Sequence, residues 1–252
     1  MNERDINAPA LTGVDRFRDP LYTVSEAARY LGVSTTTFTT WTHGYVRHPY
    51  GRPEVIGHPI VTRVGPDDDK RHRYDPSVPF IGLAEGLILA AIRRQGVPLQ
   101  RIRPALKILT EQIGIEHALA SKSLYTDGAE VLYDYAEREG DTPEARSARQ
   151  LIVVRNGQGV FNALVENYLH RITYGPDNYA HIIRLPQYTK ADIVADPTRS
   201  FGQPIFSRGG ARVKDALHLF LAGEDLQVVA AEFGMHEEDL EDVLRGTSRW
   251  AA

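Results

Sequence analysis

The chain has 252 residues, 42% of them hydrophobic and 25% charged, so it can bury a full core and differs from disordered proteins in composition. It contains no cysteine, which excludes disulfides, cysteine-ligated zinc and thiol nucleophiles. The first residues are polar and no apolar run is long enough to span a bilayer, so we expect a cytoplasmic protein with no membrane partner.

The formal net charge of −4 is unevenly distributed along the chain. Residues 70–107 carry eight Lys and Arg against two acidic residues, a net charge of +6. Residues 213–245 carry nine acidic residues against two basic ones, a net charge of −7. Because nucleic-acid-binding surfaces must neutralise phosphates, this pattern predicts one surface for a polyanion and another for a different partner.

The first twenty residues lack an apolar period and predict a flexible tail. Two short helices separated by a tight turn are predicted after them. Thr23 and Glu26 form a capping-box pattern, in which each side chain satisfies a backbone N–H at the helix start. Ser34 can cap the second helix, whose buried stripe is Phe38 and Trp41. This pattern predicts a helix-turn-helix.

A hairpin wing and two longer helices are predicted next. Residues 60–64 and 71–74 are typical of short strands, and the turn between them is rich in Gly, Pro and Asp. Apolar residues at helical spacing predict one helix within 83–92 and another within 99–113. Pro104 lies inside the second helix, where it should introduce a kink.

The middle of the chain changes to a strand-like period. Residues 123–133 predict a hairpin around Asp-Gly, and residues 151–161 predict another around Asn-Gly. A helix over 163–169 and a strand over 180–184 complete a small α+β module. The charged segment 137–150 is expected to be its most exposed connection.

The last part of the chain predicts three short helices, at 213–222, 226–233 and 237–244. We therefore expect a mainly α fold with small β elements. The predicted parts are a flexible tail at 1–20, a winged helix-turn-helix at 21–116, a small α+β middle module at 117–196, a C-terminal trihelical domain at 197–246 and a tail at 247–252.

Two segments near the N-terminus resemble a known family. Residues 21–34, LYTVSEAARYLGVS, resemble the first helix-turn-helix of MerR-type winged-helix proteins. Residues 91–102, in which an Arg-rich helix ends at Gly and a Leu-x-x-Ile helix begins, are similar to the second helical pair of that family. The resemblance implies a DNA-binding head with a recognition helix at about 35–41.

The C-terminal part resembles another family. The segment FGQPIF at 201–206, with 209–213 and 221–226, looks like domain-of-unknown-function family 433, which pairs a G-x-P-hydrophobic strand with three helices and occurs in prokaryotic antitoxins. A MerR-like head joined to this tail is similar to VapB-type antitoxins, whose toxins are PIN-domain ribonucleases. The resemblance implies an antitoxin that neutralises a VapC-like ribonuclease toxin and autoregulates its operon.

Polar and basic residues of the head are candidate contacts with operator DNA. Serine and threonine hydroxyls can bond phosphates or base edges, and arginine can pair with phosphates or guanine. The predicted contacts are Ser34, Thr35, Thr36, Thr39, Thr40, Arg63, Arg71, Arg73, Arg93, Arg94, Arg101 and Arg103.

The acidic last helix and the segment after it are candidate contacts with the toxin. An acidic or arginine-bearing segment can cover the surface at which a ribonuclease binds RNA and metal, and Trp and Arg are common interface anchors. The predicted contacts are Glu237, Glu238, Asp242, Arg245, Arg249 and Trp250. The alternative that Trp250 packs back onto its own domain stays open.

The sequence also predicts a homodimer, because helix-turn-helix proteins commonly pair two heads across half-sites. The strand at 205–206 and the inward faces of the C-terminal helices are its expected interface.

We find no catalytic constellation and no metal-ligand spacing, and we expect no cofactor. The alternative function is a MerR-like transcription regulator whose middle module senses a ligand. A nucleic-acid-processing enzyme is disfavoured, because no carboxylate or His cluster stands at ligand spacing.

Overall fold

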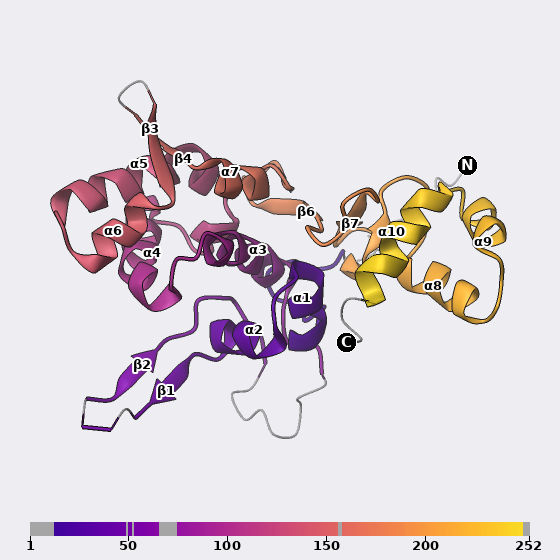
Figure 1. Ribbon diagram of the computed structural model, residues 1–252, viewed down its shortest axis with the longest axis horizontal. Helices are drawn as coiled ribbons and strands as arrows, with labels where there is room; N and C mark the ends of the chain where they lie inside the picture. Colours follow the sequence, from indigo (N-terminus) through magenta and orange to yellow (C-terminus); the bar gives the residue numbers. More distant parts are fainter. Residues whose placement is uncertain (1–12, 49, 52, 66–74, 156–157, 249–252) are drawn as a thin grey trace, which may run out of the picture.

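Helix α3 (Phe80–Arg94) lies at the centre of the molecule (Figure 1). Residues Phe80 to Ile92 are all buried, so the helix packs against neighbours on every side. The protein is described by a computed structural model that covers residues 13–48, 50–51, 53–65, 75–155 and 158–248. Within these residues the fold is mixed, with many helices and small antiparallel sheets.

The predicted helix-turn-helix is confirmed as α1 (Val24–Leu31) and α2 (Thr35–Thr42). The capping box forms, because the Thr23 hydroxyl accepts from the Glu26 N–H and the Glu26 carboxylate accepts from the Thr23 N–H. Ser34 caps α2 by accepting from the Thr37 N–H at 3.2 Å. The two helices pack against each other and α1 packs on α3.

The wing is made by other residues than those predicted. Strands β1 (Tyr45–Arg47) and β2 (Val55–Gly57) pair antiparallel, with Val46 opposite Ile56. The predicted strand at 60–64 is wrong, because the N–H groups of Ile60 and Val61 both donate to the Trp41 carbonyl and hold this segment against the end of α2. The predicted partner strand at 71–74 lies outside the described residues.

Helix α4 (Leu99–Ile113) continues through Pro104, and the short η1 (Ala118–Ala120) links it to α5 (Lys122–Arg138). The predicted hairpin at 123–133 is therefore wrong. Leu124, Gly128 and Leu132 are buried at four-residue spacing, so the apolar residues belong to one helix face.

The segment predicted to be an exposed connection, 137–150, contains α6 (Pro143–Arg149). Ala145 and Ala148 on this helix are fully buried, which corrects the expectation.

The second predicted hairpin and the helix after it are confirmed. Strand β3 (Ile152–Arg155) pairs with β4 (Gln158–Phe161), and α7 (Ala163–Leu169) follows. The turn between the two strands lies outside the described residues. The hairpin projects from the molecule near α5 (Figure 1).

An antiparallel sheet joins the middle of the chain to its C-terminal part. It is formed by β5 (Ile172–Tyr174), β6 (Ala180–Arg184), β7 (Ile193–Ala195) and β8 (Ile205–Phe206), in that order. The predicted strand over 180–184 is confirmed as β6. Ile205 and Phe206 are 0% and 3% exposed within one chain, so their side chains belong to its core and are not available to the predicted dimer interface.

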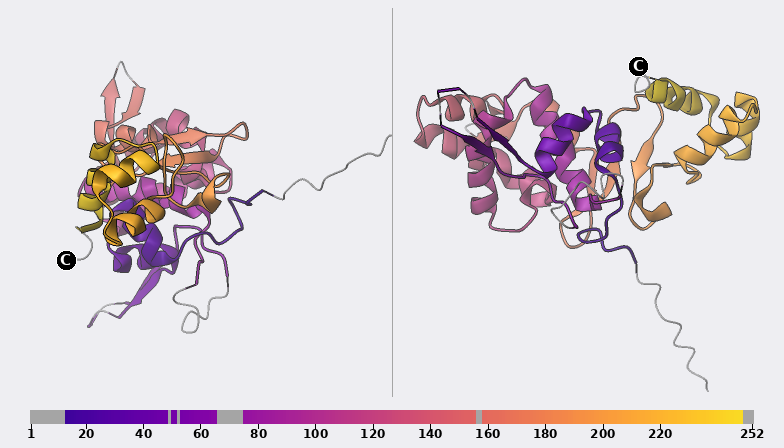
Figure 2. Two further views of the ribbon diagram at one scale, coloured as in Figure 1. Left: turned by 90° about the vertical axis from the view of Figure 1, so that its right-hand side faces the viewer. Right: turned by 90° about the horizontal axis from the view of Figure 1, so that it is seen from below.

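The three predicted C-terminal helices are confirmed as α8 (Val213–Leu221), α9 (Leu226–Glu232) and α10 (Glu237–Ser248). They form one end of the elongated molecule, away from α4–α6 (Figures 1 and 2). The short η2 (Ser200–Gly202) precedes β8, and its Gly202 carbonyl accepts a 2.8 Å hydrogen bond from the buried Tyr22 hydroxyl.

The predicted flexible tail is wrong for residues 13–20. The Arg16 carbonyl accepts from the Ile81 N–H at 2.9 Å, and the Arg16 guanidinium donates to the Ala180 carbonyl at 3.0 Å. This segment is therefore attached to both α3 and the sheet. None of the described helices is long and apolar enough to cross a bilayer.

Candidate nucleic-acid interface

The outward face of α2 carries threonines in the arrangement expected of the helix-turn-helix. Thr35 and Thr36 are exposed, and neither side chain makes a hydrogen bond within the described part of the chain. The Thr39 hydroxyl donates to the Thr35 carbonyl at 2.8 Å, and the Thr40 hydroxyl donates to the Thr37 carbonyl at 2.7 Å. These two hydroxyls are thus oriented as hydrogen-bond acceptors toward a ligand.

Close packing against α3 fixes the position of α2. The rings of Phe38 and Trp41 are fully buried and meet edge to face at 5.8 Å. A Cβ atom at Gly86 of α3 would lie only 2.6 Å from Phe38 and 2.7 Å from Leu31. The glycine therefore permits the close approach that supports the outer threonine face.

A hollow of about 210 Å³ lies between α2, the wing and the junction of α3 with α4. It brings together four of the predicted DNA contacts, Thr36, Thr40, Arg93 and Arg103. It also contains Tyr45, Arg47 and Gln100, which the sequence analysis missed. Ser34 lies outside this lining and is committed to capping α2.

Tyr45 links the wing to the cations of this hollow, which we call the head hollow. The guanidinium of Arg47 lies 4.9 Å from the centre of the Tyr45 ring, and that of Arg103 lies 5.5 Å from it. Arg103 also donates to the His58 carbonyl at the base of the wing. A Cβ atom at Gly57 would lie 2.3 Å from the Tyr45 ring, so the ring packs directly on the β2 backbone.

Arg94 does not line the head hollow, in contrast to the adjacent Arg93. Its guanidinium lies 5.2 Å from the centre of the Tyr168 ring of α7 and donates to the Leu31 carbonyl. Burial, with a contribution from the nearby Arg171, lowers the pKa of Arg94. Arg94 therefore has a packing role in this structure.

The remaining predicted basic contacts are less defined. Arg63 is half-buried and has further interactions within the chain. Arg71 and Arg73 lie outside the described residues, and Arg101 lies in α4 without a described side chain.

A sequence signal for the missed wing residues does exist. Tyr45, Val46 and Arg47 alternate in polarity, and the apolar residues at 55–56 follow after a segment rich in Gly and Pro. Such a pattern is typical of a short hairpin, although the stronger β-branched run at 60–64 competes with it.

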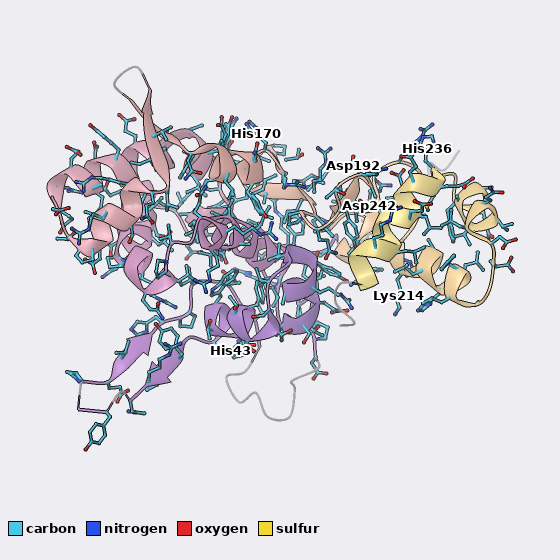
Figure 3. All side chains as sticks on the ribbon, in the orientation of Figure 1. His43, His170, Asp192, Lys214, His236 and Asp242 are labelled. Atoms are coloured by element: carbon cyan, nitrogen blue, oxygen red, sulfur yellow. The ribbon has the colours of Figure 1, made fainter. Side chains whose placement is uncertain are left out.

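The predicted toxin-binding residues on α10 divide into buried and exposed side chains. Asp242 is 7% exposed, and its carboxylate accepts hydrogen bonds from the backbone N–H groups of residues 189, 190 and 191 at 2.8–3.0 Å. Figure 3 places it on the side of α10 that faces β7. Burial alone would raise the pKa of Asp242, but these hydrogen bonds outweigh it and hold the pKa below its usual range. The prediction that Asp242 contacts the toxin is therefore corrected, because this side chain joins α10 to the backbone of residues 189–191 in the same chain.

Three other predicted toxin contacts are on the surface of α10. Glu237 is exposed, Glu238 forms an ion pair with Lys190 at 3.4 Å, and Arg245 forms one with Glu241. Arg249 and Trp250 lie outside the described residues.

Residues 20–106 match the family described as "Putative DNA-binding HTH domain". The match spans α1, α2, the wing, α3 and half of α4, which together contain every residue that lines the head hollow. The helix-turn-helix and wing of the structure thus coincide with the segment that matches this family.

The "Putative antitoxin VapB45" of Mycobacterium tuberculosis (strain ATCC 25618 / H37Rv) is 48% identical over 230 residues, which cover 91% of this chain and 94% of the relative. The chain belongs to the VapB45 family. A crystal structure described as that of Rv2018 from Mycobacterium tuberculosis is similar to this member of the VapB45 family, with a TM-score of 0.78 and 44% identity over 91% of this chain and 99% of the other. The "Uncharacterized protein Rv2308" of the same strain is 27% identical and covers 91% of each chain.

Proposed function

We propose that this protein is a DNA-binding antitoxin of a type II toxin-antitoxin system that autoregulates its operon and neutralises a PIN-domain ribonuclease. The head hollow is the observation that carries the proposal, because it unites the threonines of α2 with Arg47 and Arg93 beside a wing. Threonine hydroxyls and arginines on one surface suit contacts with base edges and phosphates. The VapB45 relative supports the antitoxin part.

In this arrangement α2 enters the major groove and the wing follows the adjacent backbone, as the resemblance to MerR-type heads implies. Tyr50 is fully exposed in the segment between the wing strands, where it is free to contact nucleic acid or its solvent shell. Val55 is exposed on the wing face that also carries Arg47, its cross-strand partner, so this face can lie against sugar and phosphate groups.

The DNA-binding proposal is tested by a salt series. Arg47→Ala and Arg93→Ala should each weaken binding of the operator-containing upstream DNA and lower the slope of log affinity against log salt by about 1, since each phosphate contact contributes roughly 0.9 to it. Arg138→Ala, at an exposed position at the end of α5, is the matched control and should change neither. Fluorescence anisotropy measures both quantities. Unchanged affinity and slope in the two head variants would disprove the assigned interface.

The second half of the proposal concerns the toxin. The C-terminal helices present the exposed acids Glu237 and Glu238 together with the exposed apolar side chains Leu221 and Val228, which are 74% and 48% exposed. Acidic residues can compete for a basic RNA-binding surface, and exposed apolar side chains can anchor an interface. We assign the toxin-binding surface to this part of the chain.

Charge reversal tests this surface. Glu237→Lys combined with Glu238→Lys should weaken binding of the proposed PIN-domain ribonuclease at least tenfold, about 1.4 kcal/mol. The matched control is Glu130→Lys combined with Asp134→Lys, two exposed acids on α5. Calorimetry gives both affinities, and equal losses in the two double variants would place the interface elsewhere.

We further propose that the protein acts as a homodimer, since one winged helix covers little DNA for tight specific binding. Light scattering should then give about twice the chain mass of 28.2 kDa. A mass of one chain at high protein concentration would exclude the dimer.

A further inference from the structure

A second, larger cavity lies at the base of the wing. It has a volume of about 950 Å³, is open to solvent, and is bordered by the base of the wing, α4 and η1. Ile56 and Ile60 contribute from the wing side, Leu106 from α4, and Leu119 from η1. A largely apolar cavity of this size is typical of a small-molecule site. We call it the wing cavity.

One end of the wing cavity holds a buried polar cluster. The Glu85 carboxylate is 4% exposed, and it accepts from the Thr62 N–H at 2.6 Å and from the Thr62 hydroxyl at 3.1 Å. The His117 ring lies 3.1 Å from the same carboxylate, and its backbone has a left-handed φ of 55°. The hydrogen bond with Glu85 raises the pKa of His117, against the effect of burial. This hydrogen bond favours the imidazolium beside the Glu85 carboxylate, and two further carboxylates, Glu111 and Glu116, also line the wing cavity.

Another part of the lining provides cations. Arg103 and Lys107 line the wing cavity one turn apart on α4. The Arg103 Nε atom is buried without a hydrogen-bond partner, and no carboxylate pairs with this arginine among the described residues. Burial lowers the pKa of Arg103, while Tyr45 opposes that shift. Because Arg103 lines the wing cavity without a carboxylate partner in the described part of the chain, a ligand oxygen that accepts from its guanidinium would be stabilising.

We propose that the wing cavity binds a small organic acid. Its aromatic or alicyclic body would pack on the apolar wall formed by the wing base, α4 and η1, and its carboxylate would accept hydrogen bonds from Arg103 and Lys107. Lys107 is already near Glu111 at 3.6 Å, but both side chains are more than half exposed, so this ion pair contributes little and can rearrange.

The position of the wing cavity connects it to the wing. Arg103 donates to the His58 carbonyl and stacks on Tyr45, so the side chain that would bind the acid also attaches the wing to α4. Occupancy should therefore hold β1 and β2 more firmly. An effect of this ligand on DNA binding would rest on the proposed function. Binding of the ligand and the resulting stiffening of the wing are independent of that function.

The test uses the full chain and two fluorescent probes that share an arylated naphthylamine. 8-Anilino-1-naphthalenesulfonate carries an acidic group and N-phenyl-1-naphthylamine lacks it. The sulfonate should bind with one saturable site and at least tenfold more tightly than the neutral amine. Equal affinities would overturn the assignment of an acid, and the absence of a saturable site would overturn the proposal entirely.

Variants locate the site. Thr110→Trp fills the wing cavity from an exposed position on α4 and should weaken binding of the sulfonate at least tenfold. Thr126→Trp is its matched control, since Thr126 is an exposed threonine on α5 whose hydroxyl also donates to the carbonyl four residues earlier. Lys107→Gln, with Lys122→Gln as control, gives a second test at exposed positions that do not endanger folding. Retained affinity in both cavity variants would overturn the site.

Hydrogen exchange tests the link with the wing. Saturating sulfonate should slow amide exchange in 45–47 and 55–57 and leave 152–155 in the β3–β4 hairpin unchanged. Equal exchange in the wing with and without the probe would overturn the stiffening while leaving the binding result intact.

Discussion

Asp242 is a buried carboxylate that joins α10 to the segment before β7. Replacing it with Asn removes the charge that the three backbone N–H groups stabilise and places an amide donor among them. We expect Asp242→Asn to lower the free energy of unfolding at pH 7 by about 1–3 kcal/mol. Urea denaturation measures this. Asp134→Asn, an exposed position on α5, is the control, and an equal loss there would contradict the role given to Asp242.

The same carboxylate predicts an acid dependence of stability. Because the pKa of Asp242 is lower in the folded chain than in the unfolded one, its stabilisation is complete above the unfolded value of about 4 and is lost as the pH falls through the folded value. The difference in unfolding free energy between the wild type and Asp242→Asn should therefore shrink below about pH 4. A constant difference down to pH 3 would contradict this prediction.

His117 predicts the opposite dependence. Its folded pKa is raised, chiefly by the hydrogen bond with Glu85, so its stabilisation is complete below the unfolded value of about 6.5 and is lost as the pH rises through the folded value. His117→Asn suits the left-handed backbone and removes the imidazole. The wild type should lose its advantage over this variant between neutral and mildly alkaline pH. Thermal melts across pH 6–9 measure the difference, and a constant value would refute the imidazolium pair.

At the level of elements, the distance between α2 and α3 depends on Gly86. Alanine there gains about 1 kcal/mol of helix propensity, but its Cβ would overlap Phe38 and Leu31. We expect Gly86→Ala to destabilise the chain by about 1–3 kcal/mol and to weaken DNA binding by displacing α2. Gly246→Ala, whose Cβ would meet only the Tyr188 ring at 3.1 Å, should cost less. Denaturation and anisotropy on the same variants check both effects.

Local signals made some elements predictable from the sequence. The capping box at Thr23 and Glu26 and the cap at Ser34 act within a few residues, so the helix-turn-helix could be read directly. The same holds for α7 and the C-terminal helices, whose apolar residues repeat at helical spacing and whose ends are marked by Asn or Gly.

Helix α5 could not be predicted in this way. Asp127-Gly128 between two apolar groups is typical of a hairpin turn, but Gly128 is buried, with a Cβ position 3.3 Å from Phe161 and 3.5 Å from Leu109. The glycine serves packing against β4 and α4, elements that are distant in the sequence. The helical state is thus selected by tertiary contacts that a local pattern does not contain.

The residues of the candidate interface were predictable only where a local helical pattern positions them. Thr36 and Arg93 follow from the helical pattern and reach the head hollow, whereas Arg94, one residue further, turns toward Tyr168. Arg47 was missed because the wing strands are three residues long and their register depends on Tyr45 packing on Gly57.

At the scale of the whole molecule, the predicted domain boundary at residue 116 crosses the core. Helix α3 packs against α7, β6 and η1, and the buried residues from the head to the C-terminal helices form one cluster. A fragment of residues 13–116 would expose one side of the largely apolar α3. We expect it to lack a cooperative urea transition, which circular dichroism would show. A cooperative transition at wild-type denaturant concentration would contradict this.

The hydrogen bond from Tyr22 to Gly202 spans 180 residues, and Arg16 reaches Ala180 across 164. A ribosome synthesises the chain from its N-terminus, so Arg16 and Tyr22 emerge long before Ala180 and Gly202, which accept their hydrogen bonds. At 5–20 residues per second, these contacts become available roughly 10–40 seconds later. During that interval the Tyr22 hydroxyl, which is fully buried in the finished fold, lacks its Gly202 acceptor. The DNA-binding head is therefore translated first but completed late, when most of the protein has been made.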